Sequence, residues 1–187
     1  MIVLLLGLAL WAVAHGVKIH APQRRAALAA QIGEGPVKIG FALAILGAVA
    51  LMVLGYQRAE FVNLWFPPAW TVHLNNLLMV IAVAIYIAGG IPGHVRHWVR
   101  HPQLVGVKTW AIAHLLVNGD LASVVLFGGL LAWAVVALIG LNKRDGKPAK
   151  PAPGGVKWDA LHAGATLLVF GAVAWVHNWL GVWPYPG

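Results

Sequence analysis

The chain has 187 residues, of which 60% are hydrophobic and only 10% are charged. Because a water-soluble domain carries about 25% charged residues, this composition indicates an integral membrane protein. The chain has no cysteine, which excludes disulfides and thiolate metal ligands. Its formal charge of +8 comes from short basic clusters between apolar runs. Membrane topology and anionic lipid account for such clusters, so we expect membrane lipid as a partner and no nucleic acid.

The apolar runs predict an all-α fold, a polytopic membrane bundle of six transmembrane helices in a single domain over residues 1–187. A helix needs roughly 20 residues to cross the hydrocarbon core. The first run resembles the core of a signal peptide, but its positive charges follow it, so we expect a retained helix. The predicted spans are about Ile2–His20, Val37–Tyr56, Ala69–Ile91, Gln103–Val117, Asp120–Leu141 and Asp159–Leu180.

The links between these spans predict the topology. Asn118-Gly119-Asp120 is expected to stop one helix and cap the next. Lysine and arginine concentrate in alternate links, which predicts that both termini lie outside and that the basic links lie in the cytoplasm. The longest of these links, residues 143–157, is rich in proline, glycine and lysine, and we expect a flexible cytoplasmic loop there.

Two histidines in apolar segments are the main functional signal. The sequence Trp11-Ala-Val-Ala-His15 nearly repeats as Trp110-Ala-Ile-Ala-His114. An ionisable side chain at membrane depth indicates a functional site. From the predicted spans, His15 lies roughly 10 Å and His114 roughly 15 Å above the inner surface. We therefore predict that both histidines are metal ligands, bound axially to one haem iron, and that the flanking alanines let a flat macrocycle approach both helices.

Each histidine also has a simpler interpretation, in which its ring hydrogen-bonds a backbone carbonyl or a hydroxyl in the bundle. His94, His97 and His101 are expected to share a helical face, with lipid, a haem propionate or a metal as possible ligands. Nearby cations on the inner side, Arg100 and Lys108, are expected to contact the haem propionates together with His101. Trp11 and Trp110 complete the predicted cofactor site.

A longer signature gives a family resemblance. Arg100-His-Pro102, Gly106, Trp110, His114 and Asn118-Gly-Asp120, with the opening helix around His15, resemble the NnrU family over essentially the whole chain. The resemblance implies a multi-pass protein of the bacterial inner membrane, associated with denitrification. It also implies a redox partner or a respiratory nitrogen-oxide reductase as a partner.

The NnrU family is similar to the zeta-carotene isomerase of plants and cyanobacteria, in which haem b drives a cis-to-trans isomerisation. That resemblance implies haem b here, with the ligand positions of the enzyme falling on His15 and His114. The enzyme's alternative cysteine ligand would fall on Ala111. This departure removes the ligand-exchange step that the enzyme uses.

Three classes of function follow. The first is a haem b protein for electron transfer or redox sensing, because two histidine ligands leave no open position on iron. The second is an enzyme: either a haem-dependent isomerase of a polyene or a relative of membrane methyltransferases, which Arg100-His101-Pro102 with Gly106 resembles. Those methyltransferases carry paired glutamates, which are absent after Gly106. The third is a haem-free assembly factor for a respiratory complex.

Overall fold

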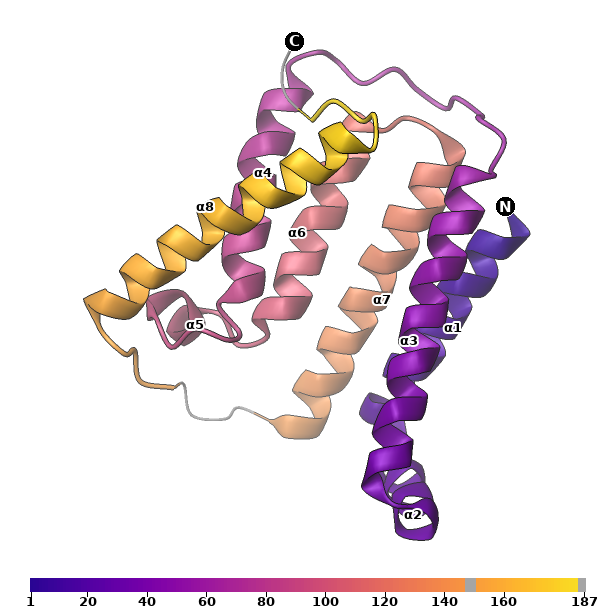
Figure 1. Ribbon diagram of the computed structural model, residues 1–187, viewed down its shortest axis with the longest axis vertical. Helices are drawn as coiled ribbons and strands as arrows, with labels where there is room; N and C mark the ends of the chain where they lie inside the picture. Colours follow the sequence, from indigo (N-terminus) through magenta and orange to yellow (C-terminus); the bar gives the residue numbers. More distant parts are fainter. Residues whose placement is uncertain (147–150, 185–187) are drawn as a thin grey trace. The chain divides into compact units, whose positions relative to one another are not determined.

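The computed structural model describes residues 1–146 and 151–184. Within those residues the chain forms α-helices and no strand, and the only β-type contact is an isolated bridge between Asn63 and Asp120. The predicted all-α class is therefore confirmed. The helices are α1 (Ile2–His20), α2 (Pro22–Ile32), α3 (Glu34–Gln57), α4 (Thr71–Ile87), α5 (His94–Trp98), α6 (Pro102–Val117), α7 (Leu121–Asp145) and α8 (Val156–Trp179) (Figure 1).

Four helices are long and apolar enough to cross a membrane, namely α1, α3, α7 and α8. The other two predicted spans are shorter, with 17 residues in α4 and 16 in α6. At 1.5 Å per residue such helices are about 25 Å long, which is less than the hydrocarbon core of about 30 Å. The chain is a helical membrane protein, and the count of six spans stays a prediction.

The links differ from the prediction in two places. Residues 21–33, expected as a plain connection, contain the helix α2. The predicted loop 143–157 is shorter than expected, because α7 continues to Asp145 and α8 begins at Val156. Residues 147–150 of that loop lie outside the described part of the chain.

The chain divides into two compact units. Unit 1 comprises Met1–Leu64 and Asp120–Gly146, and unit 2 comprises Trp65–Gly119 and Lys147–Gly187. Unit 1 therefore holds α1, α2, α3 and α7, whereas unit 2 holds α4, α5, α6 and α8. His15 belongs to unit 1 and His114 to unit 2.

Glycines allow the close packing of α1 against α3 in unit 1. A Cβ atom on Gly7 would lie 2.7 Å from the backbone nitrogen of Met52, and one on Gly55 would overlap the backbone of Leu4. Leu4 itself is fully buried. Small residues at helix contacts are the usual means of close packing in membranes, because lipid gives no hydrophobic force between helices.

The start of α7 is fixed by the cap that the sequence predicts. The Asp120 carboxylate accepts a hydrogen bond from the Ser123 backbone N–H at 2.9 Å and another from the Ser123 hydroxyl at 2.6 Å. The Tyr56 hydroxyl of α3 lies 2.9 Å from the same Ser123 oxygen. Because Ser123 gives its proton to Asp120, Tyr56 is the donor to Ser123. This chain of hydrogen bonds ties the end of α3 to the start of α7.

Unit 2 is built on α4, which packs against α6 and α8. A Cβ atom on Gly106 would lie 2.8 Å from the Cβ of Tyr86, so glycine is needed where α6 crosses α4. On the α8 side, the buried His162 ring donates from Nε2 to the Ala84 carbonyl oxygen at 2.7 Å. This histidine is part of the packing between α8 and α4.

The glycine contact in unit 1 gives a stability prediction with an internal control. Gly55→Ala should destabilise the protein by about 1–3 kcal/mol, because the added methyl group meets backbone atoms that have no room to move. Gly40→Ala, in the same helix but with no atom within 4 Å of the added group, should leave stability unchanged or slightly raised. Thermal unfolding in mild detergent measures both, and an equal midpoint for the two variants would contradict the packing.

Candidate functional site

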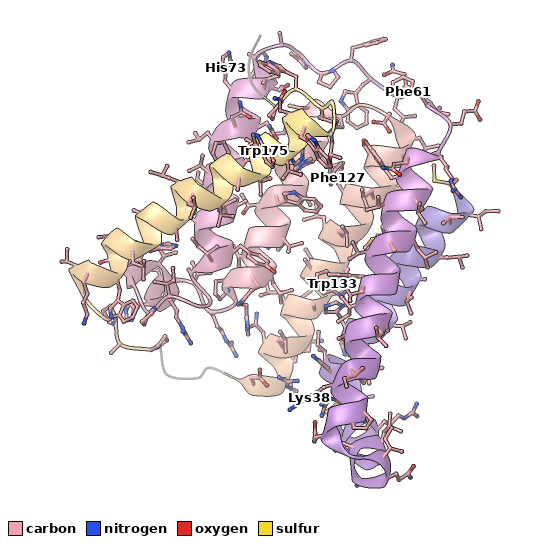
Figure 2. All side chains as sticks on the ribbon, in the orientation of Figure 1. Lys38, Phe61, His73, Phe127, Trp133 and Trp175 are labelled. Carbon is pink, nitrogen blue, oxygen red and sulfur yellow. The ribbon has the colours of Figure 1, made fainter. Side chains whose placement is uncertain are left out.

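His15 lies on α1 in an aromatic box formed with Trp11 of the same helix and Trp133 of α7. Its ring centroid is 4.2 Å from that of Trp11 and 4.9 Å from that of Trp133. The two indoles also contact each other edge-on, with centroids 5.2 Å apart and planes at 78°. Figure 2 labels Trp133 on α7 within unit 1. The three rings are called the His15 box below, and they hold the imidazole in one orientation.

Two indole N–H groups of the His15 box have no acceptor. The Nε1 atoms of Trp11 and Trp133 are both buried, and neither has a hydrogen-bond partner among the described residues. A buried donor without a partner costs roughly 1–3 kcal/mol. Tryptophan normally finds an acceptor when buried. The box therefore has capacity for an acceptor group that residues 1–146 and 151–184 do not supply.

His114 of α6 repeats the local geometry of His15. Its ring lies 4.9 Å from that of Trp110, four residues earlier. The Asn118 side-chain amide donates to the His114 carbonyl oxygen at 2.8 Å and closes the end of α6. The flanking Ala111 and Ala113 are fully buried at 0% exposure. Both alanines are therefore already packed within the protein.

One hydrogen bond fixes the tautomer of each histidine. Nδ1 of His15 lies 3.0 Å from the Trp11 carbonyl oxygen, and Nδ1 of His114 lies 2.9 Å from the Trp110 carbonyl oxygen. A carbonyl oxygen only accepts, so Nδ1 carries the proton and Nε2 carries the lone pair. The simpler interpretation, a hydrogen bond to a backbone carbonyl, is thus confirmed as a contact. This hydrogen bond engages Nδ1 and leaves Nε2 as the nitrogen that would bind a metal.

His177 lies near the end of α8, and its Nδ1 donates to the Val173 carbonyl oxygen at 2.8 Å. It therefore repeats the hydrogen bond of His15 and His114 without the preceding tryptophan. His177 is a second candidate ligand on unit 2.

The predicted propionate partners are not gathered on the face of α6 that carries His114. Arg100 is exposed and precedes the helix, and His101 occupies its N-cap position. Lys108 lies six residues before His114, which rotates it by about 120° around the helix axis. Contact with a group bound at His114 would require the long Lys108 side chain to reach around α6.

The expected face of three histidines is wrong. The backbone becomes extended at Val99, so His101 does not continue α5. His94 instead binds Asp159 of α8, with its Nδ1 2.7 Å and its backbone nitrogen 2.8 Å from the carboxylate oxygens. Nδ1 of His97 donates to the Pro151 carbonyl oxygen at 2.8 Å. These contacts hold the short helix against the start of α8.

Within residues 1–146 and 151–184, no group of three or more histidine, aspartate or glutamate side chains could hold a metal ion.

The apolar helices and the two Trp-x-x-x-His segments define the class: a helical membrane protein with histidines in its apolar interior. The family model described as NnrU protein matches residues 3–184. The chain therefore belongs to the NnrU family. Searches for similar curated proteins and for similar solved structures give no match.

The hydrogen bonds of His15 and His114 predict a tautomer. In protein free of metal, ¹⁵N NMR of histidine-labelled samples should show both residues protonated at Nδ1 and unprotonated at Nε2. His15→Asn and His114→Asn assign the two signals by their loss. Signals from Nε2–H tautomers at these positions would contradict the geometry and remove the proposed ligand atoms.

Proposed function

We propose that this NnrU-family protein binds one haem b between His15 and His114 and uses it for electron transfer or redox sensing in the bacterial inner membrane. The observation that carries the proposal is the repeated local geometry. Two histidines in apolar helices each follow a tryptophan by one turn, and each gives its Nδ1 proton to that tryptophan's carbonyl. A backbone hydrogen bond at one ring nitrogen is the usual support for a metal ligand at the other.

The residues present fit such a group. The Nε2 lone pairs of His15 and His114 are suitable axial ligands for iron, and the indole N–H groups of Trp11 and Trp133 offer donors to a carboxylate or another acceptor of the bound molecule. Haem would supply one-electron chemistry. Two histidine ligands leave no position for a substrate on iron, which favours electron transfer or sensing over isomerisation. Ala111, which stands where the isomerase has its alternative ligand, favours the same choice.

The proposal places a condition on the depth of α6. His15 is five residues from the end of α1, or about 8 Å, and His114 is twelve residues from the start of α6, or about 18 Å. If both of these helix ends face the cytoplasm, one iron can join the two histidines only when Pro102 lies about 10 Å farther toward the cytoplasm than His20.

The finer topology also belongs to the proposal. Six spans with both termini outside would put the basic links around α2, α5 and residues 143–157 in the cytoplasm, as the positive-inside rule requires. The shorter helices α4 and α6 would cross through a locally thinned bilayer. A redox partner in nitrogen-oxide respiration, such as a membrane reductase, would then deliver or accept the electron.

Ligand substitutions test the proposal directly. His15→Ala and His114→Ala should each abolish the low-spin bis-histidine absorption spectrum of the purified protein, because each removes one axial ligand. His73→Ala, at the start of α4, should keep it. The variants should still insert, since alanine is tolerated in a spanning helix.

His177→Ala separates two forms of the site. If His177→Ala and His114→Ala both lose the low-spin spectrum while His15→Ala keeps it, the ligands are His114 and His177. The proposed pair of His15 and His114 would then be wrong. A protein that purifies without colour even when cells are supplied with haem would favour the assembly-factor alternative.

Single cysteines test the topology, since the chain has none of its own. Phe66→Cys and Val182→Cys should react with an impermeant reagent from the outside. Trp98→Cys and Ala152→Cys should react only after the membrane is opened. All four positions are exposed. Labelling of Trp98→Cys from the same side as Phe66→Cys would show that α4 does not cross.

A further inference from the structure

The helix α2 is a short link between two membrane-spanning helices. Only Ala21 separates it from α1, and only Gly33 separates it from α3. Both neighbours are candidate spans. A helix joined this closely to the ends of two spans cannot leave the membrane surface. No residue of α2 is buried in the protein, so most of its side chains face the surroundings of unit 1.

A bidentate ion pair connects α2 to the first residue of α3. The Arg25 guanidinium donates from its two terminal nitrogens to the two carboxylate oxygens of Glu34, at 3.1 and 2.8 Å. This pair raises the pKa of Arg25, chiefly through the hydrogen bonds to Glu34. The helix α2 also packs on α3, and the Arg25–Glu34 pair restrains its rotation about its own axis.

Beside Arg25, α2 also carries apolar side chains that the protein covers only in part. Leu28 is 42% exposed and Ile32 is 52% exposed, and they lie one helical turn apart. Arg24 precedes them by one more turn on the same stripe and is also exposed. On the other side, Gln23, Ala26 and Ala30 are small or polar. This distribution is typical of a helix that lies in the plane of a membrane surface.

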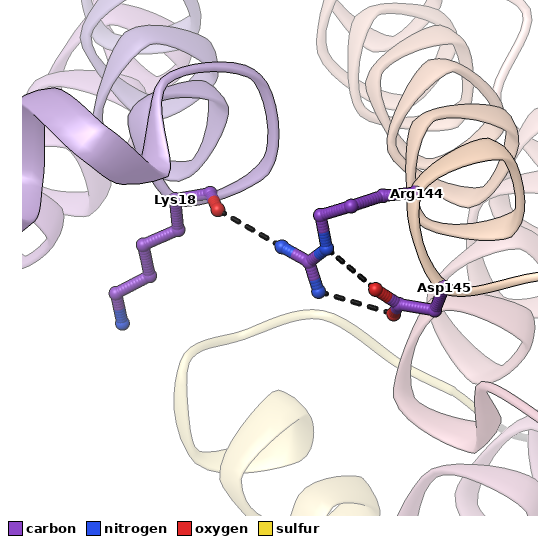
Figure 3. A network of polar contacts seen from close by, with 3 residues as sticks. All are labelled: Lys18, Arg144 and Asp145. Carbon is purple, nitrogen blue, oxygen red and sulfur yellow. Dashed lines mark hydrogen bonds and ion pairs between the residues drawn. The ribbon is translucent and has the colours of Figure 1, made fainter.

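The charges around α2 are almost all positive. Lys18 of α1 and Lys38 of α3 are exposed within a few residues of the link. Figure 3 shows that the Arg144 guanidinium of α7 donates to the Lys18 carbonyl oxygen at 3.1 Å while it pairs with Asp145. Of the nearby acids, Glu34 is already bound by Arg25. The excess of cations is complementary to phosphate groups at the surface of a bilayer.

We propose that α2 is an interfacial helix whose partner is the anionic phospholipid of the leaflet in which α1 ends. Leu28 and Ile32 enter the boundary between headgroups and acyl chains, and Arg24 binds lipid phosphate beside them. The Arg25–Glu34 pair sets the rotation that turns this face toward the lipid. The inference needs only α1 and α3 to span the membrane and is independent of haem.

Spin labels on a chain without cysteine test the placement. Nitroxides at Leu28→Cys and Ile32→Cys should be more accessible to oxygen than to a water-soluble nickel reagent in liposomes. Matched labels at Gln23→Cys and Ala30→Cys, on the other side of the helix, should show the reverse. Preferential nickel accessibility at all four positions would overturn the proposal, as would oxygen accessibility at all four.

The lipid is identified by comparing phosphatidylcholine liposomes with liposomes that also contain phosphatidylglycerol. The anionic lipid should increase the immersion of the Leu28→Cys label, and Arg24→Gln should remove that increase. Arg25→Gln is the matched control at the neighbouring position. It should keep the response to anionic lipid but reduce the difference between the Leu28→Cys and Ala30→Cys labels, because the rotation is no longer set. A response that survives in Arg24→Gln would overturn the role of Arg24.

Discussion

A bilayer contains no water to satisfy polar groups, so each polar side chain inside it needs a partner from the protein or from a ligand. This chain meets the constraint mostly with local bonds to the carbonyl four residues earlier, as in His15, His114 and His177. The same bond decides the chemistry of each histidine, because it protonates Nδ1 and leaves the lone pair on Nε2. The buried indole N–H groups of Trp11 and Trp133 are exceptions, because neither has an acceptor among the described residues. Both indoles lie beside His15.

His15 and His114 belong to different units of the chain. His15 and His114 reach their positions through separate packing: glycine contacts hold α1 on α3 in unit 1, and Gly106 holds α6 on α4 in unit 2. Binding of the proposed haem would stabilise the folded chain through mass action.

Much of the fold could be predicted because it depends on local signals. Apolar runs predicted the long helices, and Asp120 was recognised as the cap of α7 from its place after Asn118-Gly119. The Trp-x-x-x-His repeats identified the two histidines, although their ligation is still a prediction. Trp133 and the contact of His162 with Ala84 could not be predicted, because both join helices far apart in the chain. The prediction that His94, His97 and His101 share a helical face is wrong. It assumed that one helix continues to His101, whereas α5 ends at Trp98 and the backbone is extended at Val99.

The central claim is that two histidines hold one low-spin haem iron. Near-infrared magnetic circular dichroism of the oxidised protein, purified in mild detergent from cells supplied with haem, reports the identity of both axial ligands. The account predicts the charge-transfer band of bis-imidazole ligation, with one haem b per chain. A spectrum of mixed or single-histidine ligation, or no haem at all, would contradict it.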